Sequence, residues 1–544
     1  MSEEQAQERS ILYENDEEVV EFKEFVERAK LKYLKHQEDF MRFALNNEHN
    51  GHGGGCFDDM GVGKTIQVIG LLECNPQENT LIVMPVALIE QWARAIKQIA
   101  GIEPVIYHGV HKRKYDYRTL QTSFVTITSY NTLVTELPSS RSPVVKDLFR
   151  TKWARVVCDE AHHLRNMNTR MHTAVMALKA QLRWVFTGTP IQNSKDDFYG
   201  LCNIMGLKPS YYKNEANLKE LARNYLIKRS KEDVGIVLPE LRVKTEMVRW
   251  ENEKEKAIAE ALHNNLNFSG VSLDESSEVV RNLPEMNKSH FAKLMRSRQI
   301  CILPEMVADG MPTIYDKQKL AYVTEGLTSC SKVNAVLNHI AERKDNGRRK
   351  LMFCHFRDEM TRFEEELTKL GLKVSILDGR TPQKERERIL TSNAIDVLIL
   401  QVNTCCEGLN LQQYKEMYFV TLHWNPAVHD QAVGRCYRLG QTEEVDVFIF
   451  QMEGFDDEGT TKTVDTYVGE VQENKRKLCM ELDEICKERE PTDGKPRFPV
   501  NPSFNLGVEG EAQLPLVPSN TLPKLIGVKG EQSSPCSPST PPLQ

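Results

Sequence analysis

The sequence predicts an α/β protein built around two parallel β-sheets, and three observations support that class. Short apolar runs typical of buried strands alternate with amphipathic runs typical of helices between residues 80 and 187, and such alternation favours a parallel sheet. The same alternation returns between residues 331 and 450. A glycine-rich motif, GVGKT at residues 61–65, stands just before the first helix of the first alternation.

The expected strands are the short apolar runs. They are residues 80–84, 124–128, 153–158 and 184–186 in the first half, and 350–354, 374–377, 396–400, 417–420 and 445–450 in the second. Helical spacing appears between strands, as in residues 359–370 and 383–390. Residues 52–55 are expected to be a flexible lead into the glycine-rich motif. Residues 243–330 show no clear strand rhythm and only stretches of helical spacing.

Composition bounds the class of protein. The chain has 544 residues, 40% of them hydrophobic and 27% charged, and a net charge of −7 that gives no global basic field. Its thirteen cysteines form no C-x-x-C pair, so we expect no structural zinc, no disulfide framework and a reducing compartment. No apolar run approaches the ~18 residues of a membrane span, so we expect no membrane association. The acidic N-terminus lacks the apolar region of a signal peptide.

The two ends differ from the middle of the chain. Residues 1–30 are acidic and contain a short apolar stripe that we expect to belong to a solvated helix. Residues 461–488 have the spacing of one long amphipathic helix. Beyond them Pro, Gly and Ser become frequent and periodicity fails, so residues 489–544 are predicted to be disordered.

Residues 61–65 have the residue types of a phosphate-binding loop. Glycines let consecutive N–H groups point at one anion, Lys64 reaches the β- and γ-phosphates, and the Thr65 hydroxyl helps to hold Mg²⁺. The full pattern has a glycine six residues before the lysine, where this chain has Asp58. The alternative is a glycine-rich turn before a helix. Upstream, the amide of Gln37 offers the donor and acceptor that suit the edge of an adenine.

An acidic pair follows one of the expected strands. Asp159 and Glu160 open the tetrapeptide DEAH after residues 153–158, and α/β sheets bind ligands just outside the carboxyl ends of their strands. Asp159 suits the holding of Mg²⁺ through water, and Glu160 suits the deprotonation of an attacking water. The next strand ends in TGTPIQN, residues 187–193, whose hydroxyls would relay the state of the nucleotide. An ordinary hydroxyl-stabilised turn is the alternative there.

Two arginines in the second alternation are spaced for one ligand. Arg435 and Arg438 lie in QAVGRCYRLGQ, residues 431–441, three positions apart, so a helix would present both on one face. Two planar guanidinium groups suit the charge that develops during phosphoryl transfer. A second basic group is expected to be a solvated helix face, with phosphate contact as the alternative: Lys288, Lys293, Arg296 and Arg298.

The motifs GVGKT, DEAH, TGTPIQN and QAVGRCYRLGQ resemble, in this order, those of the superfamily 2 helicase-like ATPases, specifically the SWI/SNF-type DNA translocases. The resemblance spans residues 33–488 and includes the similar segments LIVMPVALIEQW, TSYNTL, KRSKEDV, RSRQIC, MFCHF and HWNPAVHDQA. That family also has an acidic residue at the position of Asp58, which accounts for the departure noted above. DEAHHLRN and HWNPAV look most like the branch that includes DNA-repair and transcription-release factors.

The resemblance implies two RecA-like lobes of the P-loop NTPase type, with ATP and Mg²⁺ in the cleft between them. The implied parts are an acidic N-terminal segment (1–30), lobe 1 (31–242), a helical insert or protrusion (243–330), lobe 2 with a brace helix (331–488) and a disordered tail (489–544). The implied catalytic residues are Lys64, Asp159, Glu160, Arg435 and Arg438. The implied nucleotide contacts are Gln37, Asp58, Asp59, Met60, Gly61, Val62, Gly63, Lys64, Thr65 and Gln431, with Thr65 and Asp159 for the metal. The implied coupling residues are His162, Thr187, Gly188, Thr189 and Gly408.

The activity implied by the resemblance is ATP-dependent translocation on double-stranded DNA, which remodels nucleosomes or transcription or repair complexes. A strand-separating DNA or RNA helicase and an ATP-gated nucleic-acid clamp with weak turnover are the alternatives. Only Cys405-Cys406 favours the clamp, because the family commonly has two glycines there and a Cβ restricts the backbone. The implied location is the nucleus, or, for a viral protein, the nucleus or cytoplasm of the host.

Overall fold

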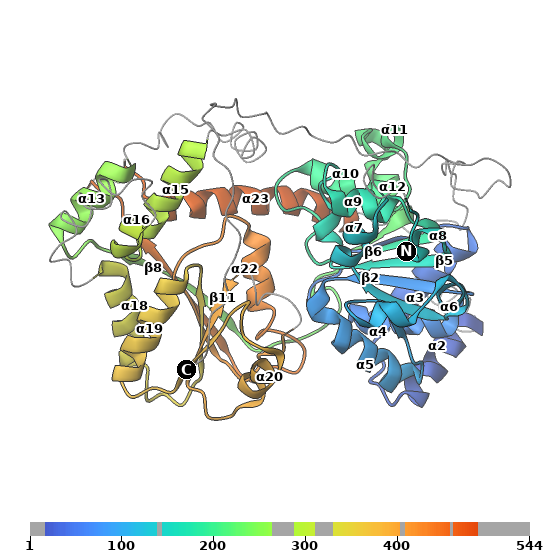
Figure 1. Ribbon diagram of the computed structural model, residues 1–544, viewed down its shortest axis with the longest axis horizontal. Helices are drawn as coiled ribbons and strands as arrows, with labels where there is room; N and C mark the ends of the chain where they lie inside the picture. The colour runs from blue at the N-terminus through green and yellow to red at the C-terminus, as the bar shows by residue number, and fades with distance from the viewer. Residues whose placement is uncertain are drawn as a thin grey trace, which may run out of the picture.

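A computed structural model describes residues 17–138, 144–263, 288–309, 330–402, 409–456 and 461–487 (Figure 1). These residues form two α/β lobes, one on a seven-stranded sheet and the other on a six-stranded sheet. Every strand pair in both sheets is parallel. The predicted fold class, two parallel-sheet lobes of the RecA-like type, is therefore confirmed. The predicted tail, residues 489–544, lies outside the described residues.

Lobe 1 is the first of these bodies, and its strands run in the order β3-β4-β2-β5-β6-β1-β7. The strands are β1 (Gly54–Cys56), β2 (Thr80–Met84), β3 (Val105–Ile106), β4 (Val125–Ser129), β5 (Lys152–Asp159), β6 (Lys179–Phe186) and β7 (Leu226–Ile227). One face is covered by α2 (Glu17–Arg28), α3 (Lys35–His49), α4 (Lys64–Cys74) and α5 (Ile89–Ala100). The other face is covered by α6 (Tyr117–Thr122), α7 (Tyr130–Glu136), α8 (Asp147–Arg150), α9 (Arg170–Met176), α10 (Lys195–Ile204), α11 (Pro209–Tyr212) and α12 (Leu218–Tyr225).

Lobe 2 has the strand order β10-β11-β9-β12-β13-β8. Its strands are β8 (Leu241–Val248), β9 (Lys350–Cys354), β10 (Val374–Leu377), β11 (Val397–Gln401), β12 (Glu416–Phe419) and β13 (Val445–Met452). The core on one face includes residues of α13 (Glu253–His263), α15 (Lys288–Ile300), α16 (Glu305–Asp309), α18 (Ser331–Glu342), α19 (Arg357–Lys369) and α23 (Val464–Lys487). The core on the other face includes α20 (Gln383–Thr391) and α22 (Pro426–Val433).

The strands predicted from the sequence are all present, and β2, β9 and β10 have the predicted bounds. The glycine-rich lead at residues 52–55 is different, because part of it is β1, a buried strand between β6 and β7. A Cβ on Gly53 would lie 1.9 Å from the carbonyl oxygen of Arg183, and one on Gly54 would lie 2.7 Å from that of Tyr225. These glycines allow close backbone packing, so the expectation of a flexible lead was wrong.

The segment predicted as an insert, residues 243–330, begins inside lobe 2 instead. Strand β8 pairs along its full length with β13 and forms the edge of the second sheet. Helices α13, α15 and α16 follow it and bury apolar residues against the same core. Polar residues on this edge strand hid its period. In α15, Arg298 is buried and donates to the carbonyl oxygen of Leu422, so the solvated face expected there is wrong for that residue.

The two terminal helices that the structure describes both belong to the folded body. Phe22 and Phe25 of α2 are almost fully buried against α3 and α4, so the expectation of a solvated helix was wrong. Helix α23 contacts α12 of lobe 1 and also α22 and β13 of lobe 2, and it spans the top of both lobes in Figure 1. A long helix follows the predicted spacing, and it joins the two lobes.

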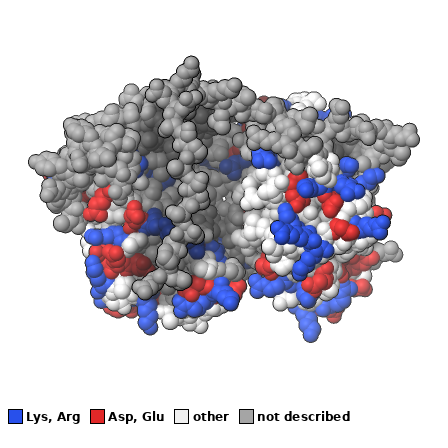
Figure 2. All heavy atoms as spheres, in the orientation of Figure 1, with Lys and Arg blue, Asp and Glu red and all other residues white. Residues whose placement is uncertain are grey.

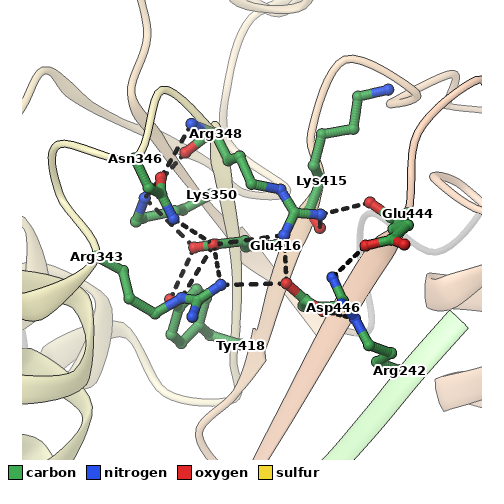
Figure 3. A network of polar contacts seen from close by, with 10 residues as sticks. All are labelled: Arg242, Arg343, Asn346, Arg348, Lys350, Lys415, Glu416, Tyr418, Glu444 and Asp446. Atoms are coloured by element: carbon green, nitrogen blue, oxygen red, sulfur yellow. Dashed lines mark hydrogen bonds and ion pairs between the residues drawn. The ribbon is translucent and has the colours of Figure 1, made fainter. Parts of the chain in front are cut away.

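A network of ions closes one end of the lobe 2 sheet (Figure 3). The fully buried Glu416 at the start of β12 accepts hydrogen bonds from Arg343 (2.6 Å), Asn346 (2.7 Å) and Tyr418 (3.0 Å), and it pairs with Lys350 over 3.3 Å. Arg343 is the C-cap of α18, Asn346 lies in the following loop, and Lys350 and Tyr418 belong to β9 and β12. The network therefore ties the end of α18 to the sheet at the start of β12.

Among the described residues on the visible side, charges of both signs are mixed (Figure 2). Figure 2 shows Lys and Arg interspersed with Asp and Glu on both lobes. Among the described helices, none is long and apolar enough to cross a membrane. The described residues likewise contain no cluster of His, Cys, Asp and Glu that is grouped to hold a metal ion.

Candidate active site

The loop between β1 and α4 has the backbone shape that its glycines permit. Gly61 and Gly63 have φ values of 87° and 96°, in the left-handed region that favours glycine. Gly63 is the N-cap of α4, so the first N–H groups of that helix face the loop. Unpaired N–H groups at a helix N-terminus favour an anion. This arrangement fits the predicted phosphate-binding loop rather than a simple turn.

The Lys64 ammonium lies over the same loop. It donates to the carbonyl oxygens of Asp58 at 2.7 Å and Asp59 at 3.0 Å. Thr65, the next residue, lies in the first turn of α4 and is half-buried. An ammonium and a hydroxyl at the mouth of the loop are suited to phosphate oxygens and a hydrated Mg²⁺.

Asp58 holds the loop from behind. Its side chain is fully buried and accepts from Arg229 (Nε to Oδ1, 3.1 Å) and from Gln67 (3.1 Å). Arg229 also donates to the backbone oxygen of His36. The backbone N–H of Asp59 donates to the carbonyl of Arg229 over 3.0 Å. Both acidic residues therefore anchor the loop to the segment KRSKEDV that follows β7, and both oxygens of the Asp58 carboxylate accept hydrogen bonds from the protein.

The start of α3 packs directly on the loop. Gln37 is buried, and a Cβ on Gly63 would lie 2.4 Å from its Nε2 atom. The neighbouring His36 contacts the carbonyl oxygen of Val62 through Nε2 at 2.8 Å. Any side chain larger than hydrogen at Gly63 would displace Gln37. The amide predicted to contact adenine thus lies beside the phosphate-binding loop.

The acidic pair stands at the carboxyl end of β5. Asp159 is the last residue of the strand, and its Oδ2 accepts from the indole N–H of Trp92 at 2.9 Å. Burial, and then the neighbouring charge of Glu160, raise the pKa of Asp159 above its usual range. Glu160 has a φ of 49°, which is rare for a residue with a Cβ. Strain of this kind is often held at functional sites.

Glu160 faces several cations. Its Oε2 is buried and accepts no hydrogen bond from the described residues, and His162 Nδ1 lies 3.4 Å from it. Burial opposes ionisation, but His162 and the charges of Lys64 and Arg435 outweigh it and lower the pKa of Glu160. An ionised carboxylate with a spare acceptor is suited to a water molecule that it would deprotonate.

Both predicted arginines reach this site from the other lobe. They follow α22, and a Cβ on Gly61 of the phosphate-binding loop would lie 3.1 Å from Cβ of Arg438. Arg435 is close enough to Glu160 to lower the pKa of that carboxyl. Burial, and then the charge of Arg435, lower the pKa of Arg438. Gln431, the remaining residue predicted on this helix, is buried in it.

Met60 marks the point where three segments meet. A Cβ on Gly188 would lie 3.1 Å from Met60 Cγ, and one on Gly434 would lie 3.5 Å from Met60 Cβ. Gly188 belongs to TGTPIQN of lobe 1, and Gly434 belongs to QAVGRCYRLGQ of lobe 2. The structure therefore brings the loop, the hydroxyl-rich turn and the arginine segment into one site.

A chain of polar contacts runs from the acidic pair toward lobe 2. His162 Nδ1 contacts Thr187 Oγ1 at 3.3 Å, Thr189 N donates to Thr187 Oγ1 at 3.2 Å, and Gln192 Nε2 donates to Thr189 Oγ1 at 3.3 Å. Asn425, the N-cap of α22, donates to Gln192 Oε1 at 2.7 Å. The TGTP segment is thus a hydroxyl-stabilised turn and part of this chain. Gly408 and Cys405-Cys406 lie outside the described residues.

Four residues at this site were not assigned roles from the sequence: Trp92, Tyr130, Arg229 and Asn425. Each lies inside a segment that resembles the family, namely LIEQW, TSYNTL, KRSKEDV and HWNPAV. Their partners are distant in sequence, so the motifs alone gave no signal of the contact.

Two protein-family models match this chain, and each match falls mainly on one lobe. The model of the SNF2-related domain matches residues 36–306, and the model of the helicase conserved C-terminal domain matches residues 331–440. The chain belongs to the SNF2-related family. Both halves of the site described above fall within these matches, the loop and acidic pair in the first and the arginines in the second.

Individual members of the SNF2-related family show the extent of the likeness. The "DNA excision repair protein ERCC-6-like" of Danio rerio is 25% identical over 77% of this chain, and the match covers 34% of that protein. The "Probable global transactivator" of Orgyia pseudotsugata multicapsid polyhedrosis virus is 26% identical, covering 76% of this chain and 85% of the viral protein. The chain thus spans about a third of the first relative and most of the second.

A solved structure is similar across most of the chain. It is described as "Sulfolobus solfataricus SWI2/SNF2 ATPase core in complex with dsDNA", with 22% identity, a TM-score of 0.36, and coverage of 84% of this chain and 97% of that chain. The fold assignment for this SNF2-related chain rests on the order and direction of its own strands.

Proposed function

We propose that this SNF2-related chain is a DNA-dependent ATP hydrolase that translocates on double-stranded DNA and thereby remodels protein–DNA complexes. One observation carries the proposal: Arg438 of lobe 2 abuts Gly61 of the lobe 1 phosphate-binding loop, beside the acidic pair. A hydrolysis site completed by residues of two lobes links each turnover to a relative movement of those lobes.

ATP is the substrate that these residues fit. The N–H groups at the start of α4 and the Lys64 ammonium bind the β- and γ-phosphates, and Gln37 contacts the adenine beside Gly63. Arg435 and Arg438 stabilise the charge that develops on the γ-phosphate, a role that a bidentate planar cation performs well. Glu160 orients a water molecule for attack and accepts its proton.

Mg²⁺ fits the donor set, because Thr65 offers a hydroxyl and Asp159 a carboxylate at the same mouth. When bound, it would neutralise charge on the phosphate oxygens. The protein's own contribution is to hold the two ligands in place: α4 fixes Thr65, and the end of β5 with Trp92 fixes Asp159.

One helix contacts both lobes and could transmit movement between them. Helix α23 contacts both lobes, and its Lys475 donates to the carbonyl oxygen of Trp424 over 3.0 Å, directly before Asn425. DNA would cross both lobes beside the cleft, and alternating closure and opening would move the DNA by small steps.

The partners that follow from this activity are double-stranded DNA and a nucleosome, transcription complex or repair complex on that DNA. The location is then the nucleus, or the host nucleus or cytoplasm for a viral protein like the relative from a polyhedrosis virus.

Two other activities make different predictions. A strand-separating helicase releases a single strand from a blunt duplex, whereas a translocase displaces a third strand from a triplex and leaves the duplex paired. A clamp with weak turnover does neither. The test is displacement of a labelled triplex-forming strand with ATP, with Lys64→Ala as the inactive control. Displacement without duplex unwinding supports the proposal, and unwinding or an absence of displacement contradicts it.

A further inference from the structure

Two helices of lobe 1 send one side chain each to Asp159. Trp92 of α5 donates its indole N–H to Oδ2 at 2.9 Å, and Tyr130 of α7 donates its hydroxyl to the Asp159 carbonyl oxygen at 2.7 Å. The helices follow β2 and β4, which stand next to β5 in the order β4-β2-β5. Asp159 is therefore held by side chains from the helices that follow the two strands on one side of β5.

The contact of Trp92 is made to the side chain of Asp159. Both side chains are buried, with exposed fractions of 2% for Trp92 and 7% for Asp159. An indole N–H is a donor only, so Asp159 Oδ2 is the acceptor of this hydrogen bond. The bond fixes the side-chain torsion of Asp159, and burial in the apolar core between α5 and the lobe 1 sheet keeps Trp92 itself from turning.

The contact of Tyr130 is different in kind. It holds the main chain at the end of β5, just before the strained residue Glu160, and leaves the carboxylate orientation to other groups. The two tethers thus separate the position of the Asp159 backbone from the direction of its side chain.

We propose that Trp92 is a positioning residue for the divalent cation: it orients the Asp159 carboxylate toward the metal that accompanies ATP. The inference rests on the proposed function for the identity of the site. Groups that orient a metal's ligands typically change metal affinity by about 10- to 100-fold when they are removed. Trp92 does not touch the nucleotide, so its loss acts on the metal requirement first.

Trp92→Phe tests this, because it keeps a buried aromatic ring and removes the N–H. The matched control is Trp153→Phe in the same lobe, where an equally buried indole donates to the carbonyl oxygen of Leu148 at 3.0 Å, away from the site. Tyr130→Phe is the second comparison, since it removes only the hydroxyl that holds the backbone.

The first readout is binding, independent of turnover and of DNA. Mn²⁺ affinity is measured by electron paramagnetic resonance on the full chain with a non-hydrolysable ATP analogue, and analogue binding is measured separately with metal chelated. We expect Trp92→Phe to lower the affinity for Mn²⁺ by about tenfold or more. Its affinity for the analogue with metal chelated should stay within twofold of wild type. Its loss of Mn²⁺ affinity should be larger than that of Trp153→Phe or Tyr130→Phe. The Mg²⁺ concentration for half-maximal ATP hydrolysis should rise in parallel.

Two outcomes would overturn the inference. Equal Mn²⁺ affinities for Trp92→Phe and Trp153→Phe would make Trp92 an ordinary core residue. An equal loss in Tyr130→Phe would assign the effect to displacement of the loop. If wild-type protein binds Mn²⁺ with the analogue but hydrolyses no ATP on DNA, the proposed function fails while the Mn²⁺ comparison still decides the role of Trp92.

Discussion

Asn425 and Gln192 join the two lobes through one hydrogen bond of 2.7 Å, from the amide N–H of Asn425 to Oε1 of Gln192. The same asparagine caps α22 by accepting from the backbone N–H of Ala427 at 3.1 Å. Helix α22 leads to Arg435 and Arg438, whereas Gln192 leads through Thr189 and Thr187 to His162. A chain of polar contacts therefore runs from lobe 2 to His162, two residues after Glu160.

Replacing the donor alone tests this link. Asn425→Asp keeps an oxygen that caps α22 and removes the N–H that Gln192 Oε1 accepts. The loss of one such bond in the transition state corresponds to about a tenfold lower DNA-stimulated kcat, with KM for ATP little changed. Steady-state ATPase assays check this, and thermal melting checks that the cap survives. A variant with full DNA stimulation would show that the bond plays no part in coupling.

The arginines should act on turnover rather than on binding. Arg435→Ala removes a cation placed for developing phosphoryl charge, and such residues are worth about a thousandfold or more in kcat. Binding of a fluorescent ATP analogue should change much less. Arg388→Ala is the control, because Arg388 is an exposed arginine of lobe 2 that pairs only with Glu385 in the described structure. Equal losses in both variants would remove the special role of Arg435.

Glu160→Gln should trap ATP. The amide keeps the size of the side chain but cannot accept a proton from water, so hydrolysis stops while Lys64 and the α4 N-terminus still bind the phosphates. Rapid filtration after mixing with labelled ATP should find intact ATP on the protein. Undiminished turnover would contradict the assignment of Glu160 as the base.

Acid should destabilise lobe 2 through its buried histidines. Burial, and then the Arg298 charge, lower the pKa of His423 to about 4, and burial with His423 lowers that of His429 to about 3. His429 Nε2 accepts from the backbone N–H of His423 at 2.9 Å, so its neutral form is the bonded one. In the unfolded chain both histidines take up protons near the ordinary pKa of about 6.5. In the folded chain they stay neutral at that pH.

The direction of the change in the free energy of unfolding follows from proton uptake. The unfolded state binds more protons than the folded state between about pH 7 and pH 4, so the free energy of unfolding falls as pH falls through that window. At about pH 5 the loss is on the order of 2 kcal/mol for each histidine. Denaturant unfolding at several pH values measures it. His429→Gln keeps an acceptor oxygen and should flatten the slope, whereas an unchanged slope would assign the acid sensitivity elsewhere.

The ion network in Figure 3 should matter for stability and not for catalysis. Glu416→Gln removes the charge that compensates the buried Lys350 and should cost about 3 kcal/mol or more. Glu385→Gln, in an exposed pair with Arg388, should cost less than about 1 kcal/mol. Denaturant melts of both variants provide the comparison. Similar costs would mean that the network is solvated in solution.

Local chemistry made much of the site predictable. The loop at Gly61, the acidic pair and the two arginines each carry their function in a few consecutive residues, and the structure brings them together. Contacts made by the fold were not predictable. Asp58 meets Arg229 across 171 residues, and Asn425 meets Gln192 across 233, so no local pattern announces either pair.

The fold was predictable where strands are buried on both faces. Strands such as β2 and β9 are continuous apolar runs and stand out in the sequence. Strand β1 was missed because its glycines are there for close packing against Arg183 and Tyr225, and glycine favours loops by propensity. Strand β8 was missed because an edge strand carries exposed polar residues.

The nucleic-acid dependence of ATP hydrolysis is the decisive test of whether this chain is a motor on double-stranded DNA. Turnover is measured on the full chain with double-stranded DNA, single-stranded DNA and RNA at equal nucleotide concentration, with Lys64→Ala as the blank. We expect duplex DNA to stimulate hydrolysis more than single-stranded DNA or RNA does, and Lys64→Ala to stay at background. Stimulation by RNA alone, or equal turnover with and without nucleic acid, would contradict it.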